Sequence, residues 1–241
     1  MKPILLLSMR QMGGRWRLMF IVLLAVLPVG LSALLSALST DDPEFVKDFT
    51  NVVIDGLIIA AVLPIVVMVL ATMAFGHELD DRTLGYLVTK PVPRSMIVLP
   101  KMMSSVVLGG FIVIASGVLA TLFGPMGSGQ AALAILVALF AGVVTYSAIF
   151  TWAGLISSRA LGFALIYVFL WEGVVTSLLS GARYLSVRGY VLSILHGIDD
   201  DGFGVVGGRV IELPAAALGV VLVTLLFFWL SVRRLKRMDV P

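Results

Sequence analysis

The chain has 241 residues, of which 60% are hydrophobic and only 13% are charged, with a mean hydropathy of +1.09. Soluble domains carry roughly 25% charged residues, so this composition excludes an ordinary soluble protein and indicates an integral membrane protein. The sequence has no cysteine, which excludes disulfides and thiolate metal sites. Its pI is near 9.4, but the basic residues flank apolar runs, which is typical of membrane orientation and not of nucleic-acid binding.

Residues 1–17 predict a helix that lies in the membrane interface. Leu5, Met9, Met12 and Trp16 fall within a narrow arc at ~100° per residue, and the basic residues fall outside it. Basic residues on such a helix favour the anionic cytoplasmic leaflet. The alternative is a frayed basic terminus that serves only to orient the protein.

Six apolar runs are long enough to cross a ~30 Å membrane core, which takes about 20 helical residues. Backbone polar groups find no water there, so each run should be helical. The runs are 18–38, 52–75, 102–123, 131–157, 160–180 and 211–232. Pro28, Pro64 and Pro214 predict kinks or first-turn positions. We therefore predict an all-α integral membrane protein with a single transmembrane domain, 1–241.

Lysine and arginine predict the orientation, because cytoplasmic loops are enriched in them. Thirteen of the seventeen fall on one side of the predicted spans: Lys2, Arg10, Arg15, Arg17, Arg82, Lys90, Arg94, Lys101, Arg159, Arg233, Arg234, Lys236 and Arg237. The other four fall on the opposite side: Lys47, Arg183, Arg188 and Arg209. Both termini and the segment 76–101 are therefore expected in the cytoplasm, with the spans in the cell (plasma) membrane.

The segment 76–101 predicts a short cytoplasmic helix that docks on another protein. Aspartates can cap the first N–H groups and a proline ends the pattern, so the helix should run over about 82–89. Leu84, Leu87 and Val88 fall at i, i+3 and i+4 and form one small apolar face, which suits insertion into a groove on a partner. The alternative is a solvated loop that carries a chance amphipathic turn.

The residue order in this segment resembles the signature of type-2 ABC exporter permeases. The matching residues are Glu78, Thr83-Leu84, Leu87, Pro91-Val92, Arg94 and Lys101. The departures are Arg82, where the family usually has Gly, and Pro100, where Gly commonly precedes the lysine. The resemblance implies six membrane helices, an N-terminal interfacial elbow helix, and contact between this segment and an ATP-hydrolysing subunit. In that contact the apolar face would enter a groove, and polar contacts at its rim would come from Glu78, Asp81, Arg82 and Arg94.

Two carboxylates lie within apolar runs. Glu172 is about twelve residues into the fifth run, where a charge costs at least ~2.5 kcal/mol and must face protein or water. It could lie on a substrate path, or it could be a structural hydrogen-bonding group at a helix contact, where Gly173, Ser177 and Gly181 permit close packing. Asp55 is only a turn into the second run, and contact with headgroups or water explains it more simply.

The segment 181–210 is expected on the extracytoplasmic side and is unusually apolar for a loop. Residues such as Tyr190, Val191 and Ile194 allow a short re-entrant or interfacial helix, which the resemblance also implies. The following run of three aspartates lacks the alternate spacing of a calcium loop, so no metal site is expected.

Enzymatic patterns are absent from the sequence: it has no G-x-x-x-x-G-K-[ST] phosphate loop, no H-E-x-x-H and no G-x-S-x-G. We therefore expect no catalytic residue and no cofactor in this chain, with ATP and Mg held by a partner. Four polar residues of the fourth run could line a polar path or join neighbouring helices: Thr145, Tyr146, Ser147 and Thr151.

The resemblance implies the permease subunit of an ATP-driven exporter. It would work with two copies of an ABC ATPase subunit and with a second permease subunit, as a homodimer or heterodimer, in contact with membrane lipid and not with nucleic acid. Two alternatives stay open: a secondary transporter or channel that uses Glu172 for ion or proton coupling, and a membrane scaffold. The lack of inverted internal repeats counts against the secondary transporter. The sequence does not identify the substrate, and it leaves export versus import undecided.

Overall fold

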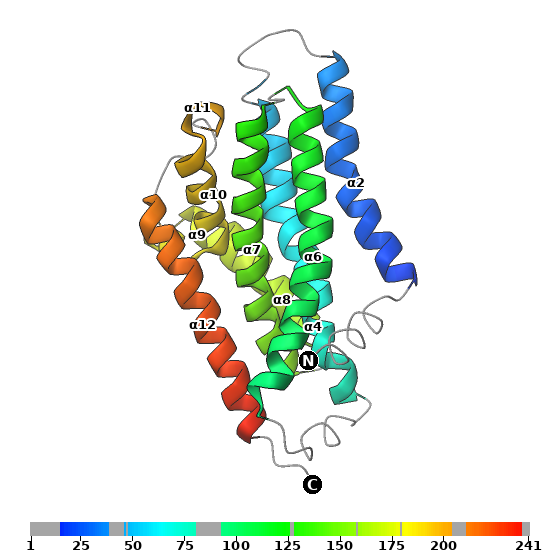
Figure 1. The fold of residues 1–241 in the computed structure, drawn as a ribbon, viewed down its shortest axis with the longest axis vertical. Helices are drawn as coiled ribbons and strands as arrows, with labels where there is room; N and C mark the ends of the chain where they lie inside the picture. Colours follow the sequence, from blue (N-terminus) through cyan, green and yellow to red (C-terminus); the bar gives the residue numbers. More distant parts are fainter. Residues whose placement is uncertain are drawn as a thin grey trace.

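The computed structural model describes residues 15–38, 46, 48–80, 93–125, 128–157, 159–178, 180–203 and 211–237. Within these residues every regular element is a helix and no strand occurs, which confirms the all-α prediction. Five of the described helices are long and apolar enough to cross a membrane. They form a bundle, and shorter helices pack along one side of it (Figure 1).

The long helices follow the predicted runs in chain order. They are α2 (Arg15–Leu38), the continuous pair η1 (Thr50–Val62) and α4 (Leu63–Asp80), α6 (Ser95–Phe123), α7 (Gly129–Ile156) and α12 (Leu213–Arg237). η1 is a π-helix, and Pro64, which has no N–H to donate, directly follows its change into an α-helix. Pro214 lies in the first turn of α12, whereas Pro28 lies inside α2.

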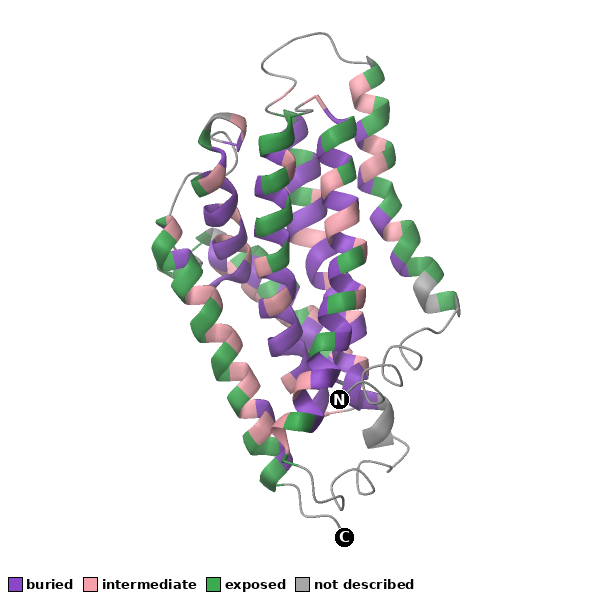
Figure 2. Ribbon diagram, in the orientation of Figure 1, coloured by how far each residue is buried: buried purple, intermediate pink, exposed green. Residues whose placement is uncertain are grey.

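Helix α7 forms the centre of the bundle, with α4, α6, α12 and the short helix α10 (Val187–Ile198) packed around it. Figure 2 shows the buried residues gathered along α7 and its neighbours. Close approach depends on small residues: a Cβ added at Gly154 would lie 2.5 Å from the carbonyl oxygen of Thr72 in α4. By contrast, only 22% and 11% of the apolar stretches of α2 and α12 are buried, so these edge helices present apolar side chains to lipid or to a partner.

Several helices extend beyond the ends of the predicted runs. Helix α6 begins at Ser95 and not at Met102, α4 continues to Asp80, and α12 continues to Arg237. The difference arises because hydropathy locates the apolar membrane core, whereas a helix continues into the polar interface while its backbone bonds are made. At the other end of the chain, Trp16 lies in the same helix as the first span.

The fifth predicted run, 160–180, does not form a long span. Its residues form α8 (Ala160–Ile166), the π-helix η2 (Tyr167–Val175) and α9 (Thr176–Leu178). At 1.5 Å per residue the apolar helix Ala160–Val175 is about 24 Å long, shorter than a ~30 Å membrane core. The prediction of six long spans is therefore corrected to five among the described residues.

After this run the chain turns back along the bundle. The 3-10 helix η3 (Ser180–Leu185) leads into α10, and α11 (Asp200–Phe203) follows. Helix α10 is not a surface helix, because Val191 and Leu195 are fully buried and it packs against both α7 and α12. In Figure 1 it lies beside the upper half of α7.

Candidate functional site

The predicted docking residues lie around the connection between α4 and α6. Glu78 belongs to the last turn of α4, and Arg94 directly precedes α6. Outside the described residues lie the other docking residues, Asp81, Arg82, Thr83, Leu84, Leu87, Val88 and Pro91, and the elbow residues Leu5, Met9 and Met12. The remaining elbow residue, Trp16, is 81% exposed at the start of α2.

The start of α6 fixes how the chain re-enters the bundle after the docking segment. The Pro93 carbonyl accepts a hydrogen bond from the Met96 N–H at 2.9 Å, and the Arg94 carbonyl accepts from Ile97 and Val98 at 3.1 Å each. Ile97 and Val98 are both buried. This first turn is therefore packed into the bundle.

Lys101, six residues after the start of α6 at Ser95, is buried. Its ammonium group donates a hydrogen bond to the Ala74 carbonyl of α4 and lies 4.5 Å from the centre of the Phe75 ring. Only 1% of the Lys101 surface is exposed. The sequence indicated Lys101 as an orienting charge at the membrane surface and as part of the family signature, and its inward position is a finding of the structure.

The Glu172 carboxylate binds the N-terminus of α10. Its Oε1 atom accepts from the Val187 N–H at 2.9 Å, and its Oε2 atom accepts from the Arg188 N–H at 3.4 Å and from the Ser186 hydroxyl. The Ser186 oxygen in turn accepts from the Gly189 N–H at 3.0 Å. The N–H groups of Val187, Arg188 and Gly189 belong to the first turn of α10, where a helix leaves its N–H groups without an internal partner. An anion is also stabilised at this end of a helix dipole.

Two tyrosines also contact this carboxylate. The Tyr167 hydroxyl donates to Oε1 at 3.4 Å, and Tyr146 of α7 lies beside Glu172. Phe150 lies between the two tyrosines, stacked on Tyr146 and edge-on to Tyr167. The carboxylate thus contacts donors from two helices and from the start of a third, which favours the structural reading of Glu172 over a free position on a path.

The second intramembrane carboxylate, Asp55, also holds α10. Its two oxygens accept from Arg188 Nε at 2.9 Å and Nη2 at 2.7 Å in a bidentate pair. The N-terminus of α10 is therefore joined to η1 as well as to η2.

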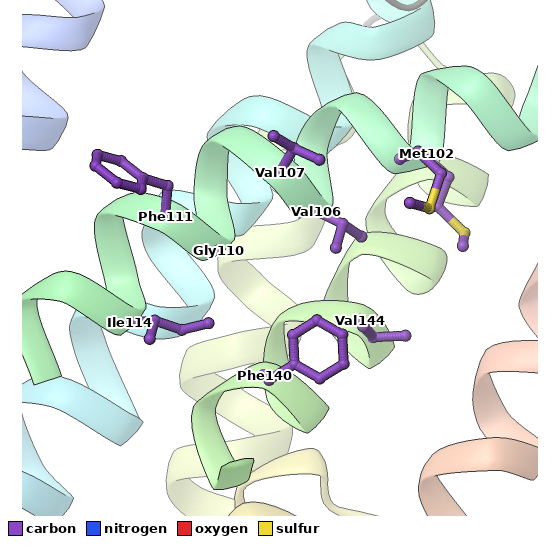
Figure 3. Close-up of a pocket in the computed structure, with 9 residues that line it drawn as sticks. Met102, Val106, Val107, Gly110, Phe111, Ile114, Phe140 and Val144 are labelled. Carbon is purple, nitrogen blue, oxygen red and sulfur yellow. The ribbon is translucent and has the colours of Figure 1, made fainter. Parts of the chain in front are cut away.

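An apolar groove lies between α6 and α7 (Figure 3). It has a volume of about 300 Å³ and is lined by Met102, Met103, Val106, Val107, Gly110, Phe111, Ile114, Phe140 and Val144. Phe111 and Phe140 are largely exposed at its mouth. Because the groove offers almost no polar atom, its lining suits aliphatic chains.

Four polar residues in the middle of α7 are buried: Thr145, Tyr146, Ser147 and Thr151. The Thr145 hydroxyl donates to the Ala141 carbonyl, whereas the hydroxyls of Ser147 and Thr151 have no partner among the described residues. No three metal-ligating side chains come together in the part of the chain that the structure describes.

Comparison with known protein families matches residues 14–182 to the family described as ABC-2 family transporter protein. The match covers more than half of the chain. The chain belongs to this family. It is the membrane permease component of an ABC-2 type transporter and a multi-pass membrane protein. Among curated proteins none matches the chain.

Membership decides between the classes of transporter that the sequence left open. ABC-2 permeases are transport subunits that lack an ATPase domain and carry no cofactor, so an ATPase partner is implied. The secondary-transporter and scaffold alternatives are not supported. The match ends at residue 182, so α10 and its contacts with Glu172 come from the structure and not from the family comparison.

Proposed function

We propose that this ABC-2 permease is the membrane subunit of an exporter, driven by two copies of a separate ATPase that dock on the segment 76–101. The arrangement of α4 and α6 carries the proposal. Both helices are long spans, both end at the same face of the bundle, and the segment is the direct connection between them. A rigid displacement of the segment therefore reaches two spans together.

The docking contact is made by the apolar face of Leu84, Leu87 and Val88. A face of three side chains is too small to hold a domain, but it suits the insertion of a short helix into a groove. Glu78, Asp81, Arg82 and Arg94 contribute polar contacts around it, and Thr83 and Pro91 set where the helix begins and ends. Thirteen basic residues on this side of the spans favour a cytoplasmic position, where ATP is hydrolysed.

The working unit is a dimer of two permease subunits, either identical or related. Two ATPase copies need two docking segments, and one chain has a single segment of this kind. The exposed apolar side chains of α2 and α12 supply surface for the second permease subunit and for lipid. The helix made of α8, η2 and α9 enters the membrane without forming a full span, and α10 returns into its outer half as a re-entrant helix.

In this assembly Glu172 anchors α10. The carboxylate accepts hydrogen bonds from the first residues of α10 and from Tyr167 of its own helix. A charge of this kind is tolerated inside a membrane when it faces protein donors. The role of Glu172 is thus to position the re-entrant helix beside α7, and it is not to carry protons.

Leu84→Asp tests the docking proposal. It places a charge in the proposed contact face, and loss of a buried apolar anchor costs roughly 2 kcal/mol or more before the buried charge is counted. Association with the ATPase should therefore weaken by well over tenfold. Co-purification of the ATPase with the tagged permease measures this, and membrane insertion should survive because position 84 lies outside every apolar run.

Thr89→Asp is the matched control, since it adds the same charge to the other side of the predicted helix. Asp80→Asn is a milder control at the end of α4. Both should retain the ATPase. If Leu84→Asp keeps its ATPase and full transport, the segment is an ordinary loop and the docking proposal is wrong.

A further inference from the structure

We propose that Lys101 is a positioning residue that clamps α4 to α6, so that the docking segment moves both spans as one body. This inference rests on the proposed function, because it concerns how a force applied to the segment 76–101 enters the membrane. Lys101 does not touch the ATPase or the substrate. It acts through the two helices that the segment connects.

The position of the contact is the first observation. Ala74 lies six residues before α4 ends at Asp80, and Lys101 lies six residues after α6 begins at Ser95. At 1.5 Å per residue each arm is about 9 Å long. The hydrogen bond from Lys101 to the Ala74 carbonyl therefore joins α4 and α6 at equal distances from the segment, so it holds the two helix ends together.

The burial of the lysine is the second observation. A lysine near the end of a membrane helix usually extends its ammonium group to the polar interface, because burying the charge is costly. Lys101 instead points into the bundle with 1% of its surface exposed. A helix carbonyl, which has a second lone pair to offer, replaces part of the lost water, and so does the face of the Phe75 ring at 4.5 Å.

Packing alone does not explain this choice of residue. Above Lys101 the same two helices are held by apolar contact, for a Cβ added at Gly109 of α6 would lie 3.4 Å from Leu70 of α4. Replacing a buried charged group with an apolar side chain of similar size is often neutral for stability or even stabilising. A directional bond between the helices therefore fixes their relative register, which apolar contact does only weakly.

Lys101→Met separates the clamp from ordinary stability. Methionine keeps the length and the apolar stem but removes the charge and the donor, so the unfolding temperature and the co-purifying ATPase should stay near wild type. The readout that discriminates is movement. A single spin label is attached at Ser128→Cys, in a chain that has no natural cysteine. It reports the distance between the two permease copies before and after ATP is trapped on the complex. In Lys101→Met the fraction of molecules that move should fall by about fivefold or more.

Three further variants complete the test. Lys101→Arg keeps a buried cation and a donor and should recover part of the response, although its planar group fits differently. Phe75→Leu keeps an apolar side chain but removes the ring, and should reduce the response by a smaller factor; if Lys101→Met does not fold, this variant decides alone. Lys236→Met removes an exposed lysine of α12 on the same side and should change nothing.

The outcomes separate the two proposals. If the wild-type permease retains no ATPase, the proposed function fails. If wild type retains its ATPase and responds to ATP, and Lys101→Met or Phe75→Leu responds equally, only the clamp is wrong. A reduced response in both variants with the ATPase retained supports the clamp, since a residue needed only for folding would not change movement at constant stability.

Discussion

Glu172 and Lys101 are buried charged side chains that contact the backbone of another helix, and the two sites differ in what they join. Glu172 faces the N-terminus of α10, where the helix dipole favours an anion, whereas Lys101 faces the Ala74 carbonyl inside α4. The acid contacts several donors around one short helix. The base donates to a backbone carbonyl of a second long span.

This difference indicates two separate mechanical roles. The contacts of Glu172 are concentrated on the turn that begins α10, and Asp55 adds a bidentate pair with Arg188 at the same turn. A helix end with so many contacts is an anchor that resists movement. Lys101 joins α4 to α6 close to the docking segment, where the proposed force enters, so it transmits movement.

Glu172→Leu should break the anchor and have the largest effect on stability. It leaves the N–H groups of Val187 and Arg188 and the Ser186 hydroxyl without their acceptor, and each buried unpaired donor costs about 1–3 kcal/mol. The free energy of unfolding in detergent should fall by at least about 3 kcal/mol. Denaturant titration of the purified permease measures this loss.

Glu172→Gln sharpens the same test. An amide offers one acceptor oxygen and turns an NH₂ group toward a site full of donors. The free energy of unfolding of the glutamine variant should therefore lie between that of wild type and that of the leucine variant. A glutamine variant with normal stability but no transport would contradict the anchor role, because it would mean that the charge itself is needed for transport.

Ser186→Ala should have a smaller effect on the same helix end. It removes the cap of the Gly189 N–H and one donor to Glu172, but Val187 and Arg188 still bind the carboxylate. Loss of an N-cap serine costs about 1 kcal/mol. Proteolysis near α10 should become faster, whereas the ATP-driven response at Ser128 should remain. A lost response at unchanged stability would show that the anchor also transmits movement, and the contrast between the two sites would fail.

The sequence predicted the long helices well because their signal is local. Runs of apolar residues identify α2, α4, α6, α7 and α12 wherever they pack, and Pro214 marked the first turn of α12 correctly. The fifth run was predicted as a full span because hydropathy does not register the change to π-helix at Tyr167 or the turn at η3. The predicted helix ends were displaced because hydropathy marks only the apolar core, and α6 begins well before its apolar core.

The candidate site was less predictable because its contacts join distant residues. Glu172 was recognisable as an intramembrane charge, but its partners lie 14 to 16 residues later in α10. A local signal did exist: Ser186 before a short apolar run is a typical N-cap, and it indicated where a helix begins. Nothing in the pattern around Lys101 indicated that it would point inward, because the deciding partners, Ala74 and Phe75, belong to another helix.

The central claim is that the segment between α4 and α6 is the contact site of the ATPase. A photocrosslinking amino acid at position 87, compared with one at Ser128 in the turn at the opposite end of the bundle, tests it in membranes that contain the intact complex. We expect illumination to join the ATPase to the permease from position 87 and not from position 128. An ATPase adduct from position 128, or its absence from position 87 in a complex that still co-purifies, would contradict the account.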